Sequence, residues 1–384
     1  MDLKKHKSNL NILHIIVGLG DGGAEASLFK LISSDKINNH VVISLSDFGK
    51  YGDLFSKINI PTYALNFKRN RLNFIKLKKL LKIVKQHDPK IIQSWMYHAD
   101  FITSIVKIFF PKKKIIWGIR NTTYKFKDSV SRYLICKICS YLSHLIPNLI
   151  ISCSEKASKD HIRIGYSKKK IEVIYNGVDL NKFKEKNINV LDQNKIKFPQ
   201  LNHKKPSIGM VARYDQQKGH KILLESLFIL KQKKIDFNCY LVGSNIDQNN
   251  LELTSIIKKY NLASNIFLLG QIPETDFVYN ILDVSILSSI NGEGFPNVLI
   301  ESMACSTPCV ATNIGDASYI IEKTGWIAKP GDSASLANEL EKAILEINHP
   351  NWLTRKENCR QRVKMNFDIV HMLNKFQLTW SRIS

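Results

Sequence analysis

The chain of 384 residues lacks several features that would place it in other protein classes. No apolar run is long enough to span a bilayer, which excludes a helical integral membrane protein. The basic N-terminus is followed by no apolar segment, so we predict no signal peptide. The seven cysteines show no framework spacing, which indicates a reducing cytosol. Cys136 and Cys139 form a C-x-x-C without a second pair at zinc spacing, so we predict that they pack in the core, like Cys305 and Cys309.

Acidic residues are scarce as well. The chain has 33 Asp and Glu against 56 Lys and Arg, a net charge of +23. Residues 1–180 carry +18 of this charge and residues 181–384 carry only +5. One half of the molecule therefore produces most of the positive field, which fits a partner such as nucleic acid, an anionic membrane surface or a phosphorylated substrate.

Short β-branched runs alternate with longer amphipathic ones, and this alternation starts again in the second half. The strands lack the polar alternation of a solvated sheet face, so we predict buried parallel strands in two doubly wound α/β domains. In the first half they are Ile12–Val17, His40–Leu45, Lys90–Ser94, Lys114–Ile119, Leu149–Ser152 and Glu172–Tyr175. In the second half they are Ser207–Ala212, Phe237–Val242, Ile266–Leu269, Val284–Leu287 and Cys309–Ala311.

The predicted domains are residues 1–180 and residues 181–360, joined through a polar Lys- and Asn-rich linker. Residues 361–384 form a C-terminal segment, within a helical pattern that runs over about residues 355–384. Open parallel sheets bind ligands at the carboxyl ends of their strands, and two such domains side by side are expected to form a cleft there. Candidate functional residues are therefore sought where strands end.

The first strand runs into the glycine-rich stretch GLGDGGAEASLFKL, which contains Gly22 and Gly23 before a helix expected to begin near Ala24. Glycines let backbone amides approach a phosphate, and a helix N-terminus favours negative charge. The spacing is not that of the dinucleotide fingerprint, so a nicotinamide site using Asp47 is a weak alternative. A tight turn without a ligand is the structural alternative.

Two cations follow the first strand of the second half. Arg213 comes directly after the strand, and Lys218 comes five residues later, before a predicted helix. A guanidinium and an ammonium at one strand end can clamp a diphosphate. Two solvated surface charges are the alternative.

Two glutamates flank a tight turn further on. Glu293 precedes the predicted start of a helix and Glu301 lies inside it, and between them come Gly294, Phe295, Pro296 and Asn297. Backbone amides of Gly294, Phe295 and Asn297 are predicted to be free at that helix start, where they suit phosphate or sugar hydroxyls. The carboxylates can bind two hydroxyl-bearing parts of one ligand, as in a nucleotide sugar. A helix N-terminal charge effect with one surface glutamate explains the spacing equally well.

The sequence here resembles the family 4 glycosyltransferases, which have the GT-B fold of two facing Rossmann-like domains with a C-terminal helix that crosses back to the first. The resemblance extends over nearly the whole chain in ordered motifs: GGAE at 22–25, QSWMYHADF at 93–101, VIYNGVDLNKF at 173–183, VARYDQQKGH at 211–220, IFLLGQIPETDFVYNILDVSILSS at 266–289, and EGFPNVLIE followed by SMACSTPCVATNIG.

The resemblance implies a retaining glycosyltransferase with a nucleotide-sugar donor, no metal and no cofactor. It implies that Arg213 and Lys218 hold the donor phosphates and that Glu301 binds the ribose. Glu293 and the backbone of residues 294–297 are then expected to contact the donor sugar, with Glu293 at the catalytic centre. Gly22 and Gly23 are expected to approach the diphosphate from the first domain.

The chain departs from the family at two places. A family histidine usually follows the strand that is IIWGI here, and this chain has Arg120 at that position. Arg120 is therefore expected to contact phosphate or acceptor. His98 is expected to supply the imidazole, and a histidine satisfied by its local neighbours is the alternative. Ser306 stands where the family usually has a glycine, which leaves the geometry of that turn open.

In the mechanism that the resemblance implies, the acceptor hydroxyl attacks on the leaving-group side and the departing phosphate takes its proton. A glycosidase with a carboxylate pair is the alternative enzyme, although Arg213 and Lys218 have no role in it. A non-catalytic GT-B subunit and a basic nucleic-acid-binding protein are the alternatives from other classes. The latter lacks a recognition motif, so no nucleic-acid partner is predicted.

The basic first half suggests where the acceptor is. Residues 66–86 form a cationic helix pattern with apolar Phe74, Leu77, Leu80, Leu81 and Val84, and residues 105–116 place two phenylalanines beside three lysines. Both suit docking on anionic lipid. Ordinary helices that cover a sheet and carry solvated lysines are the alternative for each segment alone, but they do not explain the charge asymmetry. We therefore expect a cytoplasmic protein at the inner face of a bacterial membrane, with a UDP-sugar as donor. Its acceptor would be a polyprenyl-diphosphate-linked glycan of a surface polysaccharide.

Overall fold

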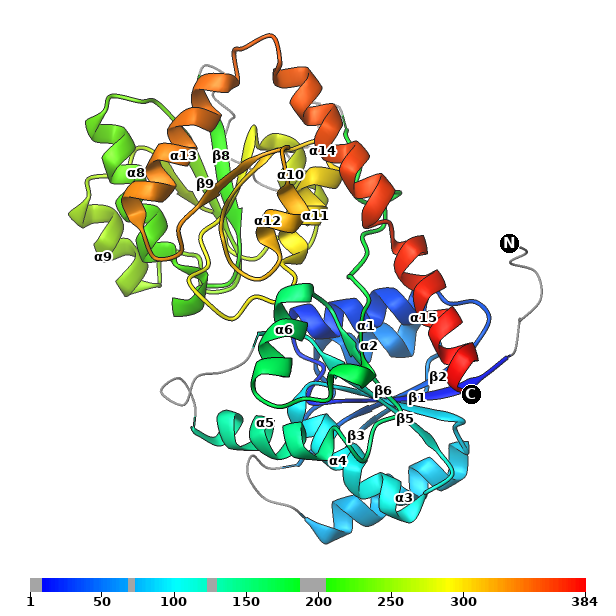
Figure 1. Cartoon of the computed structure of the whole chain (residues 1–384). Coiled ribbons are helices and arrows are strands. Elements are labelled where there is room, and N and C mark those ends of the chain that lie inside the picture. Colours follow the sequence, from blue (N-terminus) through cyan, green and yellow to red (C-terminus); the bar gives the residue numbers. More distant parts are fainter. Residues whose placement is uncertain (1–8, 68–72, 123–129, 187–204) are drawn as a thin grey trace. The chain divides into compact units, whose positions relative to one another are not determined.

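The computed structural model describes residues 9–67, 73–122, 130–186 and 205–384. It divides into two compact units, Met1–Gly177 with Ile369–Ser384 and Val178–Asp368, which are coloured along the chain in Figure 1. Much of the predicted linker, and part of the cationic pattern at 66–86, lie outside the described residues. Within the described ranges, no helix is long and apolar enough to cross a membrane.

The first unit is built on a parallel sheet of seven strands in the order β3-β2-β1-β4-β5-β6-β7. The strands β1, β2, β4, β5 and β6 are buried along almost all of their length, because helices cover both faces of the sheet. Their bounds are β1 Asn11–Ile16, β2 Asn39–Ser44, β3 Thr62–Ala64, β4 Ile91–Trp95, β5 Lys114–Ile119, β6 Leu149–Ser152 and β7 Ile171–Val173.

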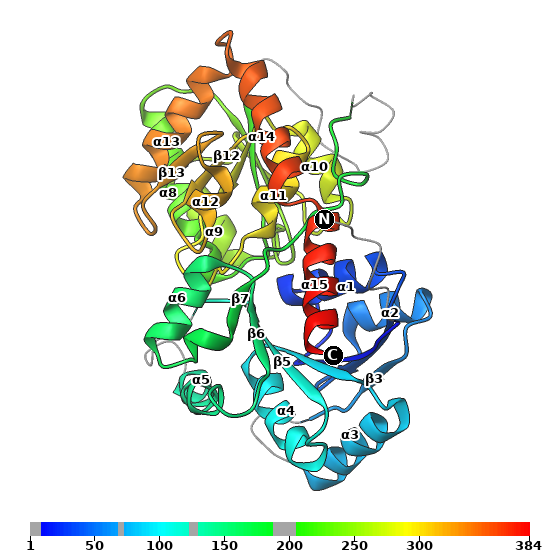
Figure 2. The ribbon, with the colours of Figure 1, turned by 45° about the vertical axis from the view of Figure 1, so that its right-hand side comes forward.

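Two helical layers sandwich this sheet. On one face of the sheet, α3, α4 and α5 share a hydrophobic cluster with the strands. On the other face, α1, α2 and α15 share a second cluster with them. Figure 2 shows α3, α4 and α5 on one side of the strands and α1 and α15 on the other. The helices are α1 Gly23–Ser34, α2 Gly49–Lys57, α3 Phe74–His87, α4 Tyr97–Phe109, α5 Val130–Leu142, α6 Glu155–Arg163, the 3-10 turn η1 Lys168–Lys170 and α15 Ile369–Ile383.

The second unit has a parallel sheet of six strands in the order β10-β9-β8-β11-β12-β13. Its strands are β8 Ser207–Val211, β9 Asn238–Val242, β10 Ile266–Leu268, β11 Val284–Leu287, β12 Cys309–Thr312 and β13 Trp326–Ala328. Its helices are the 3-10 turn η2 Gln216–Lys218, α8 His220–Gln232, α9 Leu251–Lys259, α10 Thr275–Ile281, α11 Asn297–Ala304, α12 Ala317–Ile321, α13 Ser333–Glu346 and α14 Trp352–Asn366.

The predicted α/β class and parallel strands are confirmed, and the eleven predicted strands all exist with ends shifted by at most two residues. The strands β3 and β13 were not predicted, since each has only three residues and too short a pattern to recognise. All seven cysteines are buried, as predicted for the four that were considered.

One helix was predicted wrongly. The pattern over about residues 355–384 is two helices, α14 and α15, with Phe367 and Asp368 between them. Phe367 ends α14, and its carbonyl accepts a hydrogen bond from Val178 N at 2.8 Å. α15 belongs to the first unit, where Phe376 and Trp380 are fully buried. The apolar spacing continues through the break, so periodicity alone could not reveal it.

Candidate donor site and glycosyltransferase family

The ends of β8 and β11 are joined by backbone contacts in the second unit. Ile290 N donates to Gln217 O at 2.8 Å, and Ser288 Oγ donates to Lys218 O at 2.8 Å. Gly219 has a φ of 69°, and a Cβ there would lie 2.1 Å from Ser288 O. The two loops approach this closely because position 219 has no side chain and adopts a left-handed conformation.

This contact brings together two of the predicted site residues. Lys218 Nζ lies 2.6 Å from Glu293 Oε1, with the two side chains 24% and 15% exposed. Ser289 Oγ also donates to Glu293 Oε1 at 2.9 Å. Ser289 is itself held by Thr312 Oγ1, which donates to its carbonyl at 2.6 Å. The carboxylate of Glu293 is therefore fixed by a cation and a hydroxyl at the carboxyl ends of β11 and β12.

Arg213 lies just after β8 and pairs with the carboxylate of Asp215. Arg213 Nη2 and Nε lie 3.1 and 3.3 Å from Asp215 Oδ2. Asp215 also accepts a hydrogen bond from Gln217 N at 2.9 Å, so it caps η2. Burial raises the pKa of Asp215, but the Gln217 amide and the Arg213 guanidinium outweigh burial and hold the pKa below its usual range. Asp215 was not predicted as a site residue, although it lies in the same motif as both cations.

The turn after Glu293 leads into α11. Gly294 O accepts a hydrogen bond from Asp316 N at 3.0 Å, and Gly315 at φ 56° leaves room for this contact. Pro296 is the N-cap residue, and no side chain caps the helix. A helix N-terminus can attract anionic or hydroxyl groups, so ligand binding by the backbone of residues 294–297 stays a prediction. Phe295 is buried and packs on Phe367, so its side chain is structural.

Glu301 is half-buried one turn inside α11. It lies beside Tyr279, whose pKa is raised well above its usual value by burial and by this carboxylate. The buried side of α11 is formed by Leu299, Ile300 and Met303. Ser306 has a φ of 61°, so this serine adopts the left-handed conformation that a glycine would adopt more easily.

The first unit contains the other predicted residues. Gly22 is the N-cap of α1, which begins at Gly23, and a Cβ on Gly22 would lie 2.4 Å from Glu25 Oε2. The start of this helix thus already faces a carboxylate. His98 lies half-buried in the first turn of α4.

Arg120 follows β5, where its guanidinium stacks on the Trp95 ring with 3.9 Å between the guanidinium carbon and the ring centroid. Its Nη1 donates to Asn176 Oδ1 at 3.1 Å, while Nε and Nη2 are buried with no partner among the described residues. Burial lowers the pKa of Arg120 to about 10. Stacking on the negative face of an indole is favourable for a cation that has no carboxylate partner.

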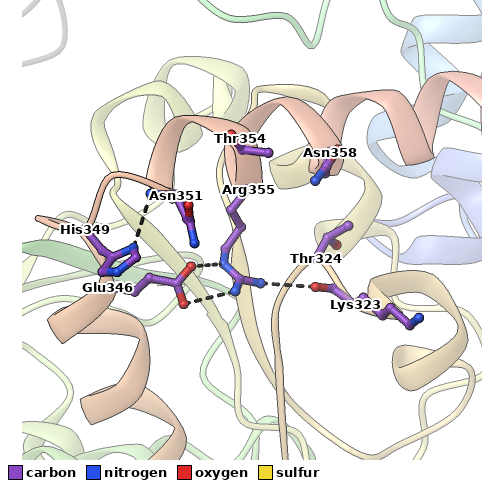
Figure 3. A pocket seen from close by; sticks show the side chains of 8 residues that line it. All are labelled: Lys323, Thr324, Glu346, His349, Asn351, Thr354, Arg355 and Asn358. Atoms are coloured by element: carbon purple, nitrogen blue, oxygen red, sulfur yellow. Dashed lines mark hydrogen bonds and ion pairs between the residues drawn. The ribbon is translucent and has the colours of Figure 1, made fainter.

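A polar cavity of about 520 Å³ lies elsewhere in the second unit, around the turn between α13 and α14 (Figure 3). Glu346 accepts from Arg355 Nε and Nη2 at 2.6 and 3.0 Å, and Arg355 Nη1 donates to Lys323 O at 3.1 Å. The guanidinium is thus already satisfied, and the cavity contains none of the predicted site residues. In the part of the chain that the structure describes, no cluster of three His, Cys, Asp or Glu could hold a metal.

Two family models match adjacent parts of the chain. The model described as Glycosyltransferase Family 4 matches residues 22–182, and the model described as Glycosyl transferases group 1 matches residues 192–359. Together they cover all but the two ends and a short linker. The chain is a glycosyltransferase with a Glycosyltransferase Family 4 domain followed by a Glycosyl transferases group 1 domain.

The relatives and solved structures of this glycosyltransferase agree with that family. It is 27% identical to the capsular polysaccharide biosynthesis glycosyltransferase CapM of Staphylococcus aureus, over 80% of this chain and 82% of CapM. It is also 27% identical to the UDP-Gal:alpha-D-GlcNAc-diphosphoundecaprenol alpha-1,3-galactosyltransferase of Escherichia coli, over 98% and 97% of the two chains. HepE of Anabaena, solved with UDP, has a TM-score of 0.83 at 22% identity and covers 97% of this chain and 100% of its own. The predicted GT-B fold is confirmed.

Proposed function

We propose that this glycosyltransferase moves a hexose-type sugar from a UDP-sugar to a polyprenyl-diphosphate-linked glycan of a bacterial surface polysaccharide. Two relatives support this acceptor class: the Escherichia coli enzyme named above, and a Campylobacter jejuni N-acetylgalactosaminyltransferase at 26% identity that acts on a diphospho-undecaprenol-linked sugar. Support for uridine comes from the UDP-galactose in the name of the former and the UDP bound to HepE.

The observation that carries the proposal is the Lys218–Glu293 pair beside the uncapped start of α11. In the proposed complex, Arg213 and Lys218 bind the donor diphosphate and Glu301 binds the ribose. Glu293 and the backbone of residues 294–297 bind the donor sugar. Both cations face carboxylates in the ligand-free chain, so the diphosphate replaces Asp215 and Glu293 as their anionic partner. Gly22 and Gly23 are the proposed contribution of the first unit to diphosphate binding.

The proposed reaction retains the configuration of the transferred sugar. The acceptor hydroxyl forms the new bond to the anomeric carbon on the face from which the diphosphate leaves, and its proton passes to the departing phosphate oxygen. The enzyme orients both substrates and stabilises the charge that develops on the diphosphate, for which Arg213 and Lys218 suffice without a metal. His98 and Arg120 are the proposed residues of the first unit nearest to the chemistry.

A lipid-linked acceptor places the protein in the cytoplasm at the inner face of the cell membrane. The positive charge of residues 1–180 supports this location, because anionic lipids attract basic surfaces. The same charge also supports nucleic-acid binding as a second candidate function. Two observations together would favour that alternative. The protein would bind duplex or single-stranded nucleic acid with a steep salt dependence, and it would bind no sugar nucleotide.

A thermal-shift panel of UDP, GDP, ADP and their sugar conjugates tests the proposal, on wild type and on Glu301→Ala, with EDTA present. We expect UDP and one UDP-sugar to raise the melting temperature of wild type but not of the variant. NMR of the product should then show the anomeric configuration of the donor. If no nucleotide shifts the melting temperature of wild type, the chain is not a UDP-sugar transferase. If nucleotides bind but no transfer occurs to any lipid-linked glycan, a non-catalytic subunit is the better description.

A further inference from the structure

Helix α5 carries an apolar stripe on its solvent-exposed side. Val130, Leu134, Ile138, Tyr141 and Leu145, the last just beyond the helix, follow one another at intervals of three or four residues. This spacing places them along one side of the helix. Each is between 48% and 73% exposed.

A different side of α5 packs against the core of the first unit. Cys136, Cys139 and Ser140 are buried against the first unit, and both cysteines belong to the hydrophobic cluster under α3, α4 and α5. A surface helix normally has one apolar stripe, which faces the core, while its opposite side is polar. Isolated exposed apolar residues are common, but a contiguous row of them marks an interaction surface.

The neighbouring helices extend this surface. Ile108 and Phe109 are exposed at the end of α4, and Phe74 and Ile75 are exposed at the start of α3. These helices lie in the same layer as α5, on the side of the sheet opposite to α15 (Figure 2). Nine of the seventeen exposed large apolar side chains of the described residues belong to this layer, so the apolar exposure is concentrated there.

The charge of the layer has one sign. The only acidic residue in α3, α4 and α5 is Asp100, which is fully buried. Lys137 lies beside the stripe on α5, and α3 presents a row of lysines to solvent, Lys78, Lys79, Lys82 and Lys85. Exposed apolar side chains among cations, without acids, complement a surface that is anionic at its face and apolar beneath.

We propose that the stripe on α5 inserts into an anionic lipid bilayer, with the lysines of α3 and α5 at the level of the headgroups. This inference rests on the proposed function, in which the acceptor is held in a membrane, and it names the element that docks there. A second copy of the chain is the less suitable partner, since pairing two stripes would bring like charges together.

The cysteine distribution permits a direct test of insertion depth. All seven native cysteines are buried, and burial raises the pKa of the Cys136 thiol to about 11, so a new exposed cysteine can be labelled selectively. An environment-sensitive fluorophore is attached in Ile138→Cys and, as a control, in Leu378→Cys on the exposed side of α15. We expect phosphatidylglycerol vesicles to shift the emission to the blue at position 138 only.

Flotation of matched triple variants tests the energetic role. Leu134→Asn, Ile138→Asn and Leu145→Asn together should weaken binding to phosphatidylglycerol vesicles by about tenfold or more. Leu345→Asn, Leu353→Asn and Leu378→Asn together, equally exposed on other helices, should leave it unchanged.

Several results would overturn the proposal. These are equal flotation of wild type and the first triple variant, no flotation of wild type, an equal loss in both triple variants, or equal binding to phosphatidylcholine. A blue shift at position 138 that occurs without vesicles and increases with protein concentration would show that a second copy covers the stripe. UDP-sugar binding, measured in parallel by thermal shift, separates these failures from a failure of the proposed function.

Discussion

Lys218 and Glu293 neutralise each other across two loops of the second unit, with 2.6 Å between Nζ and Oε1. Family resemblance assigns the first to phosphate and the second to sugar, and neither role by itself requires a contact between them. In the proposed complex, the donor diphosphate therefore has to compete with Glu293 for the ammonium. We expect the carboxylate to become available to sugar hydroxyls once the phosphate has replaced it.

Substitutions at this pair should separate binding from transfer. We expect Lys218→Met to weaken UDP binding and to lower kcat/KM by about a hundredfold, because it removes the cation that stabilises the negative charge of the leaving diphosphate. Glu293→Gln should bind UDP at least as tightly as wild type, because the ammonium loses its competing carboxylate, but it should lower kcat. Calorimetry with UDP and steady-state kinetics measure the two effects. Equal losses of UDP affinity in both variants would contradict the assigned roles.

Asp215 should restrain the binding of anions at Arg213. Asp215→Asn keeps an oxygen that can accept the hydrogen bond from Gln217 N, but it removes the negative charge beside the guanidinium. We expect UDP and inorganic pyrophosphate to bind about threefold more tightly, in line with the small energy of an exposed ion pair. Calorimetry at two salt concentrations checks this. Weaker binding in the variant would show that Asp215 orients Arg213 for the ligand.

Gly219 should not accept a side chain unless the neighbouring backbone moves. Gly219→Ala places a Cβ against Ser288 O, and the backbone carbonyl has little room to move. We expect it to cost about 3 kcal/mol of unfolding free energy and to disturb Lys218. Gly331→Ala is the control, with φ 74° and no atom within 4 Å of the added Cβ, and should cost about 1 kcal/mol. Urea denaturation compares them, and equal losses would mean that the loops readily separate.

A buried histidine should make the first unit sensitive to acid. His161 Nδ1 lies 2.7 Å from Ala157 O and Nε2 lies 2.8 Å from Tyr97 Oη, so the neutral ring donates to the carbonyl and accepts from the phenol. Burial lowers the pKa of His161 to about 4.

Because this folded pKa lies below the unfolded one, the unfolded chain takes up the proton first. Stability is therefore full above about pH 6.5 and falls by about 3 kcal/mol as the pH drops to about 4. His161→Gln should reduce this slope, which urea unfolding at several pH values measures. An unchanged slope would assign the acid sensitivity to other groups, such as the buried His220.

Some strands and helices could be predicted from the sequence and others could not. The strands β5, β6 and β11 begin and end where the apolar runs do, because a strand covered on both faces must be apolar along its whole length. The short strands β3 and β13 could not be predicted because three residues are too few to show a hydrophobic period. The break between α14 and α15 escaped notice because both helices keep apolar spacing while packing in different units.

The α/β class, the charge asymmetry and the ordered motifs follow from residue types and local spacing, which are readable along the chain. Which charges meet depends on the folded chain, since Lys218 and Glu293 are 75 residues apart and come together through the close approach at Gly219. The folded chain likewise decides which apolar residues stay exposed. The run VSRYLICKICSYL predicts a buried helix, but only packing shows that α5 buries Cys136 and Cys139 and leaves a second apolar side uncovered.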